Sequence, residues 1–109
     1  MSNPRCFLPQ PTDLDVSTAA EYGELKVLIH NSNVFDPDGT IRNFFDALDF
    51  EGFDPMVDFI VLSCPVLSTL ELTVAICQYM AERHEDLTRV NFLVFNSKSR
   101  AYQVLGVPL

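Results

Sequence analysis

Residues 57–84 have the sequence VDFIVLSCPVLSTLELTVAICQYMAERH and carry the strongest structural signal in the chain. The first part, Val57 to Ser63, contains a run of consecutive apolar residues, which is typical of a central strand covered on both faces. Pro65 cannot donate a backbone hydrogen bond to a sheet, so we expect the strand to end before it. The stretch therefore begins with a buried strand that leads directly into another element.

The second part of this stretch predicts a helix. Ser68 and Glu71 have the spacing of a capping box, which favours a helix beginning at Ser68. Apolar residues then recur at helical spacing as far as Met80, and we expect the helix to run to about His84. Cys77 falls inside this apolar stretch and is predicted to lie in the core.

A second strand and helix precede this pair. Residues 25–30 become almost wholly apolar and predict another buried strand. Within residues 41–48, apolar side chains recur at i, i+3, i+4 and i+7, the pattern of an amphipathic helix. Asp38 or Thr40 is expected to cap this helix, and Gly52 lies just beyond its end.

The ends of the chain complete the predicted fold. Residues 90–95 and 101–107 are β-rich and flank a polar loop at 96–100, which predicts a hairpin. Residues 1–20 contain three prolines and no periodicity, and we interpret them as an irregular N-terminal arm. Residues 21–109 then form a single α/β domain of order β-α-β-α-β-β. Its four-stranded, mainly parallel sheet has an antiparallel edge strand and two flanking helices.

The chain is acidic. Its 109 residues carry a formal net charge of −8, and 48% of them are hydrophobic, a globular composition. Because duplex-binding proteins present cations to phosphates, we expect no direct nucleic-acid binding. Most of the acidic residues fall within residues 1–75. A protein partner or a homo-oligomer is the expected kind of partner.

Several other classes of protein are disfavoured. Cys6, Cys64 and Cys77 show no paired spacing, so neither a disulfide framework nor a metal site is expected. No glycine-rich phosphate loop occurs, and no cofactor is expected. The start of the chain lacks an apolar export signal, and the most apolar stretch is interrupted by charges and a proline. We therefore expect a cytoplasmic protein that does not enter a membrane.

One short motif invites a catalytic interpretation. Residues 36–40, Asp-Pro-Asp-Gly-Thr, resemble the first motif of the haloacid dehalogenase phosphohydrolases. That resemblance implies an aspartate nucleophile at Asp36 and a magnesium site, but no later acidic pair follows a strand to hold the metal. We interpret the motif as a turn that leads into a helix.

Cys64 and His30 form the basis of one functional hypothesis. His30 ends one predicted parallel strand and Cys64 follows another, so both are expected at the carboxyl edge of the sheet, where open α/β sheets bind ligands. A helix that begins just after Cys64 would favour its thiolate. The alternative function is therefore a small thiol-dependent enzyme with Cys64 as nucleophile and His30 as base.

The leading hypothesis is a non-catalytic protein-interaction or assembly protein. Acidic residues alternate with aromatic ones after the first predicted helix, a pattern suited to docking a basic, partly apolar partner. The residues expected at this interface are Asp46, Asp49, Phe50, Phe53 and Asp54. The hypothesis predicts an oligomer or a larger complex, and an edge hairpin that pairs between subunits is a further route to assembly.

Overall fold

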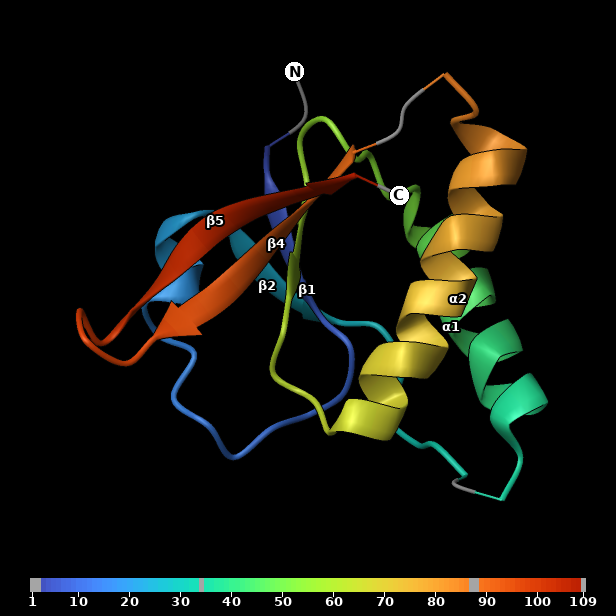
Figure 1. Cartoon of the computed structure of the whole chain (residues 1–109), viewed down its shortest axis with the longest axis horizontal. Helices are drawn as coiled ribbons and strands as arrows, with labels where there is room; N and C mark the ends of the chain where they lie inside the picture. Colours follow the sequence, from blue (N-terminus) through green and yellow to red (C-terminus); the bar gives the residue numbers. More distant parts are fainter. Residues whose placement is uncertain (1–2, 34, 87–88, 109) are drawn as a thin grey trace.

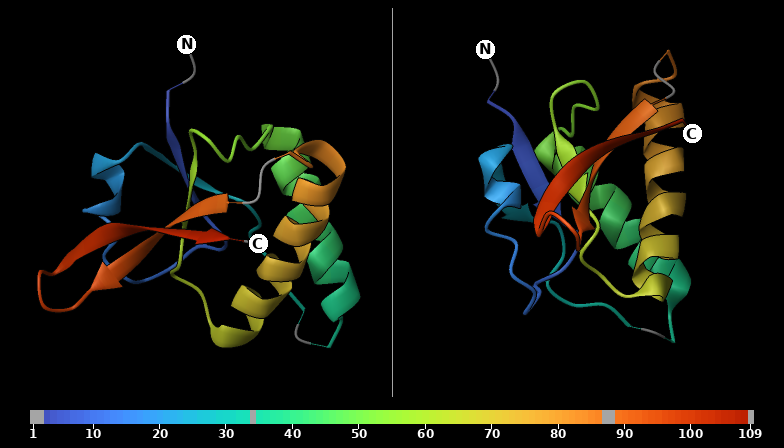
Figure 2. Two further views of the ribbon diagram at one scale, coloured as in Figure 1. Left: turned by 45° about the horizontal axis from the view of Figure 1, so that its top comes forward. Right: turned by 60° about the vertical axis from the view of Figure 1, so that its left-hand side comes forward.

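The computed structural model describes residues 3–33, 35–86 and 89–108 of the chain. Five strands form one sheet, and two helices lie side by side on one of its faces (Figures 1 and 2). In chain order the elements are strand β1 (Arg5–Leu8), 3₁₀ helix η1 (Ala19–Glu21), β2 (Glu24–Val27), α1 (Pro37–Glu51), β3 (Phe59–Val61), α2 (Val66–Arg83), β4 (Arg89–Asn96) and β5 (Ala101–Pro108).

The strand order across the sheet is β2-β1-β3-β4-β5. The pairs β2–β1, β1–β3 and β3–β4 are parallel, whereas β5 pairs with β4 in the antiparallel sense at an edge. The predicted α/β class, the mainly parallel sheet, the antiparallel edge strand and the two helices are confirmed. The expected number of strands was wrong, because the sheet has five strands rather than four.

The additional strand comes from the predicted irregular arm. In β1, Cys6 pairs with Leu25 on one side and with Phe59 on the other, so the arm lies between the two strands it was expected to precede. Pro4 and Pro9 bound this strand instead of disrupting it. Four residues are too few to show a period, which explains why the pattern gave no sign of the strand.

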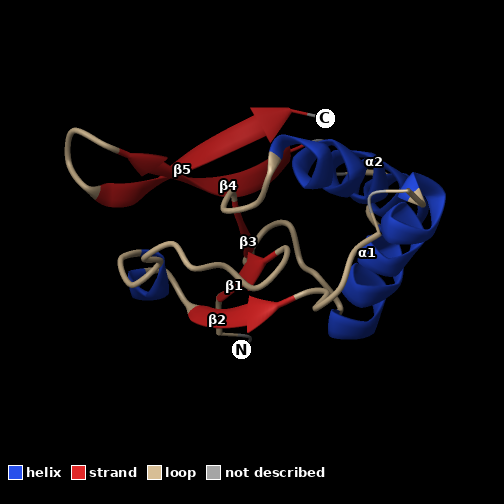
Figure 3. Cartoon of the chain, turned by 90° about the horizontal axis from the view of Figure 1, so that it is seen from below, coloured by secondary structure: helices blue, strands red, loops and turns tan. Residues whose placement is uncertain are grey.

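The two faces of the central strands are covered differently. Phe7 and Ile60 belong to the core beneath α1 and α2. Cys6 and Val61 belong to a smaller core on the opposite face, which contains Ala19 of η1. Figure 3 shows η1 and the helices on opposite sides of the sheet. Residues 9–23 therefore replace a helix as the cover of the second face.

The first helix begins earlier than expected. The Asp36 side chain accepts a hydrogen bond from the Gly39 N–H at 3.0 Å, and Pro37 occupies the first helical position. The cap is therefore Asp36 and not Asp38 or Thr40, and residues 37–40 form the first turn of the helix rather than a turn before it. Gly52 ends the helix with a φ of 63°, which confirms its predicted place.

The second helix does not begin with the predicted capping box. It begins at Val66 after Pro65, and no side chain caps it. Ser68 and Glu71 lie inside the helix and are buried. The Ser68 hydroxyl accepts a hydrogen bond from Gln10 Nε2 at 3.2 Å, because this part of α2 packs beside the end of β1.

A buried ion pair attaches β1 to the rest of the protein. The Asp58 carboxylate is almost fully buried and accepts hydrogen bonds from Arg5 Nη2 at 2.8 Å and from the Arg5 backbone N–H at 3.1 Å. Asp58 also accepts from the Asp54 backbone N–H at 2.8 Å. The Arg5 guanidinium donates further to the carbonyls of Glu51 and Gly52, at the end of α1. One arginine therefore joins β1 to both ends of the α1–β3 connection.

Replacing Asp58 with alanine is expected to lower the free energy of unfolding by about 3 kcal/mol, because the Arg5 guanidinium loses its buried partner. Urea denaturation followed by circular dichroism measures the change. The double variant R5A/D58A is expected to lose clearly less unfolding free energy than the sum of the losses in R5A and D58A. The reason is that each single variant leaves one partner of the ion pair unsatisfied.

The matched control is the ion pair between Arg83 Nε and Asp49 Oδ1, which is 2.9 Å long and exposed to solvent. We expect R83A to leave the free energy of unfolding nearly unchanged, because exposed ion pairs contribute little. A loss in R83A as large as that in D58A would contradict the special role of the buried pair.

Candidate functional site

The two predicted catalytic residues lie at the same edge of the sheet, but they belong to segments that follow different strands. His30 is exposed and follows β2, and Cys64 is half-buried in the turn after β3. β1 lies between these two strands, so their ends are about 10 Å apart, two strand spacings. Among the described residues, no hydrogen bond joins Cys64 to His30. The inserted strand thus separates the predicted nucleophile from its predicted base.

The Cys64 thiol has a different partner. Its Sγ lies 3.2 Å from Thr69 Oγ1 in the first turns of α2. Burial raises the pKa of Cys64, and the hydrogen bond with Thr69 offsets only part of that rise. At neutral pH the side chain is consequently a protonated thiol, which is a weak nucleophile. The environment of Cys64 is the opposite of what the thiol-enzyme hypothesis requires.

The predicted acidic-aromatic interface loses one of its two aromatic residues. Phe53 is only 1% exposed, and its ring packs between those of Phe7 and Tyr79 at centroid distances of 6.0 and 6.1 Å. Its carbonyl accepts a hydrogen bond from the Tyr79 hydroxyl. The expectation that Phe53 contacts a partner was wrong, because the turn after Gly52 directs its ring into the core.

The other residues of that segment are accessible. Phe50 is 89% exposed, and Asp46 and Asp49 are exposed along α1. Asp49 pairs with Arg83, and the Asp54 side chain accepts a hydrogen bond from the Met56 N–H within its own turn. An interface at this place stays a prediction, with Phe50 as its single exposed aromatic residue.

A second exposed surface lies on α2 and was missed in the sequence. We call it the outer face of α2 and define it by six residues that point away from the core: Val66, Leu67, Leu70, Val74, Cys77 and Ala81. Val66, Leu70 and Val74 follow one another at intervals of four residues and are 78%, 60% and 43% exposed. All six residues are uncharged, so the apolar surface runs along most of the helix.

The position of Cys77 corrects a further prediction. We expected Cys77 in the core because it lies in an apolar stretch, yet it is exposed on the outer face of α2. The core side of the helix is formed instead by buried residues such as Leu72, Ala75, Ile76 and Tyr79. The helix is therefore apolar on two opposite sides, a pattern typical of helices that are covered on both.

A helical projection of the sequence contains the signal that could have found this surface. Val66, Leu70, Val74 and Cys77 fall on one side of such a projection, and Leu72, Ala75 and Tyr79 fall on the other. A single core-facing stripe requires only the second group. The extra apolar residues indicate a second buried side, which the described part of the chain does not provide.

The three thiols are expected to react with iodoacetamide in a definite order. Cys77 reacts first because it is exposed, and Cys64 reacts slowly because burial raises its pKa. Cys6 reacts only on unfolding, since burial, and then the charge of Asp58, raise its pKa to about 11. Mass spectrometry of peptides after timed alkylation at neutral pH measures the order. Faster alkylation of Cys64 than of Cys77 would restore the thiol-enzyme hypothesis.

Comparison with other proteins adds no functional assignment. Within residues 3–33, 35–86 and 89–108, no three His, Cys, Asp or Glu side chains are grouped in a way that could hold a metal ion. No helix in the same part of the chain is long and apolar enough to cross a membrane. No protein-family model, curated protein or solved structure matches this chain.

Proposed function

We propose that this chain is a small acidic assembly protein that works as a homo-oligomer through the outer face of α2. The observation that supports the proposal is the run of exposed, uncharged side chains along that helix. Large contiguous apolar patches are uncommon on monomeric proteins and mark sites of interaction.

The energetics favour covering this surface. Val66, Leu70 and Val74 expose much of their apolar area to water. Removing such area from water contributes roughly 25 cal/mol for each Å². On its other side α2 packs against the sheet and α1, and none of residues 3–33, 35–86 and 89–108 covers the outer face.

A second copy of the chain is the partner that fits best. An α-helix of 18 residues is about 27 Å long and presents a narrow, nearly straight surface. Two such helices can pack antiparallel about a two-fold axis, with Leu70 and Val74 of both copies near the centre. Because the outer face carries no charge, this packing brings no like charges together at the contact.

The overall charge modulates the proposed association. Each chain has a net charge of −8, so two copies repel one another at long range. Salt screens this repulsion and strengthens apolar contacts. We therefore expect the dimer to be more stable at high than at low ionic strength, the opposite of an interface held by ion pairs.

The exposed Cys77 bears on the compartment in which such a dimer would work. In the antiparallel arrangement Cys77 lies within the contact, and an oxidising environment would favour oxidative modification of its thiol. The proposal therefore includes a reducing compartment, the cytoplasm.

Light scattering after size-exclusion chromatography tests the proposal. The unchanged protein is expected to elute as a dimer, and L70E as a monomer, because the substitution places a carboxylate in the centre of the apolar contact. Circular dichroism should remain native, since Leu70 is largely exposed in the single chain. The control F50E adds the same charge at an exposed residue outside the outer face and is expected to remain a dimer.

Other outcomes would contradict the proposal. A monomer at all protein concentrations and salt concentrations would exclude self-association. A dimer that F50E dissociates and L70E does not would place the interface in the acidic-aromatic segment. A dimer that only L105K dissociates would place it at the exposed edge strand β5.

A further inference from the structure

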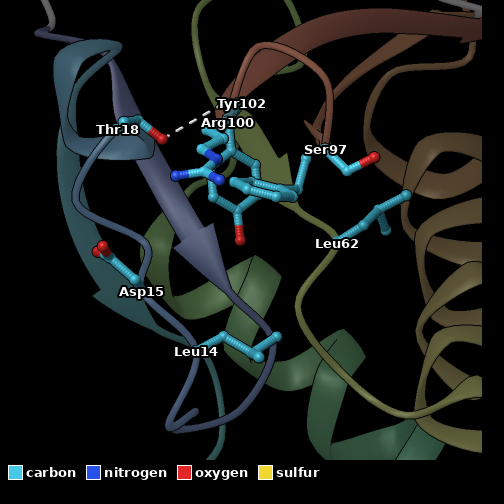
Figure 4. A pocket seen from close by; sticks show the side chains of 8 residues that line it. Leu14, Asp15, Thr18, Leu62, Ser97, Arg100 and Tyr102 are labelled. Carbon is cyan, nitrogen blue, oxygen red and sulfur yellow. Dashed lines mark hydrogen bonds between the residues drawn. The ribbon is translucent and has the colours of Figure 1, made fainter.

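A cavity of 440 Å³ lies at the carboxyl edge of the sheet, away from the outer face of α2 (Figure 4). Its apolar wall comes from Leu14 after β1, Leu62 after β3 and Phe95 at the end of β4. Its polar groups include Asp15, Arg100 and Tyr102. The volume is in the range of cavities that hold small organic molecules.

The strand order explains why a cavity forms at this place. The chain leaves β1 to cover one face of the sheet and leaves β3 to cover the other with α2. The connections therefore diverge between two neighbouring strands, and such points are the usual ligand sites of open α/β sheets. A second cavity of 550 Å³ shares Leu14 and Leu62 as walls and is lined by Ser63, whose buried hydroxyl has no hydrogen-bond partner among the described residues.

Tyr102 supplies a polar group that points into the cavity. The residue is 3% exposed, and its hydroxyl has no hydrogen-bond partner in the part of the chain that the structure describes. Figure 4 shows the hydroxyl directed into the space between Leu14 and Leu62. Burial, and then the charge of Asp15, raise the pKa of Tyr102, so the hydroxyl stays a donor at neutral pH. The hydroxyl faces the open cavity, where a ligand can accept its hydrogen bond.

Arg100 supplies a positive charge at an unusual backbone position. Its φ is 56°, in the left-handed region that the hairpin turn would more easily fill with glycine. Within residues 3–33, 35–86 and 89–108, its guanidinium forms no ion pair. An arginine at a strained position with a free guanidinium is typical of a functional residue.

Asp15 supplies a negative charge to the same cavity. Its carboxylate accepts a hydrogen bond from the Ser17 N–H at 2.9 Å, and this bond lowers the pKa of Asp15. The carboxylate is therefore ionised at neutral pH. The cavity thus combines one cation, one anion, an unpartnered hydroxyl and an apolar wall.

We propose that this cavity binds a free amino acid with a large apolar side chain. Arg100 pairs with the carboxylate of the ligand, Asp15 pairs with its ammonium group, and Tyr102 donates a hydrogen bond to the carboxylate. Leu14, Leu62 and Phe95 contact the apolar side chain. A zwitterion satisfies both charges of the cavity, whereas an anion would face Asp15 and a cation would face Arg100.

Three related probes separate the two charged contacts. L-Tryptophan carries both charges, indole-3-propionate lacks the ammonium group, and tryptamine lacks the carboxylate. Titration of the ¹⁵N-labelled protein is expected to shift the amides of Leu14, Asp15 and residues 97–102, with L-tryptophan binding tightest. The outer face of α2 should show no shifts, which also makes this result independent of the proposed self-association.

Two variants that each remove one charge then assign the contacts. R100Q is expected to lower the affinity for L-tryptophan and indole-3-propionate by about tenfold, the contribution of one charge-assisted hydrogen bond. Its affinity for tryptamine should be unchanged. D15N keeps the side-chain oxygen that accepts the hydrogen bond from Ser17. It is expected to lower the affinity for L-tryptophan and tryptamine but not for indole-3-propionate. If either residue had a purely structural role, its substitution would weaken the binding of all three probes equally.

The variant R100G tests the strained position separately. We expect it to raise the melting temperature by about 2–5 °C, because glycine adopts this backbone conformation without strain, while the affinity for L-tryptophan falls by about tenfold as in R100Q. The proposal is overturned if millimolar L-tryptophan shifts no amide of the cavity, or if R100Q and D15N bind it as tightly as the unchanged protein. Equal losses for the three probes would overturn it as well.

Discussion

The buried contact between Arg5 and Asp58 is the interaction on which the rest of the structure depends. Asp58 lies just before β3, and Arg5 opens β1, so the ion pair joins two segments more than fifty residues apart. Arg5 also lies over the Phe7 ring, 4.9 Å from its centroid. These contacts hold a four-residue strand, too short to be stable by itself, in the middle of the sheet.

The central position of β1 shapes both the core and the edge of the sheet. Phe7 extends the core under the helices, and Cys6 and Leu8 extend the smaller core under η1. The same strand separates His30 from Cys64 and creates the divergence of connections beside which the cavity lies. The ion pair that holds β1 in place therefore keeps Cys64 and His30 apart and helps to form the cavity.

The molecule presents two surfaces that serve different chemistry. The outer face of α2 is convex, apolar and uncharged, which suits a protein contact. The cavity at the carboxyl edge is concave and combines apolar walls with opposite charges, which suits a small ligand. The outer face of α2 begins at Val66, directly after the turn that lines the second cavity. The second cavity shares Leu62 with the first, so one segment of backbone connects the cavities to the outer face.

The sequence by itself determined the α/β class, four of the five strands, both helices and the hairpin, because local runs or periods of apolar residues and the loop between the last two strands indicate them. It did not determine β1, since a short strand between prolines has no period and is held by a distant carboxylate. Nor did it determine which side of α2 is buried, because a helix with apolar residues on two opposite sides satisfies either orientation. The tertiary structure alone decided that Phe53 enters the core, that Cys77 is exposed and that Arg100 and Tyr102 share a cavity with Asp15. Such placements depend on contacts between residues far apart in the chain, and local patterns carry no information about those contacts.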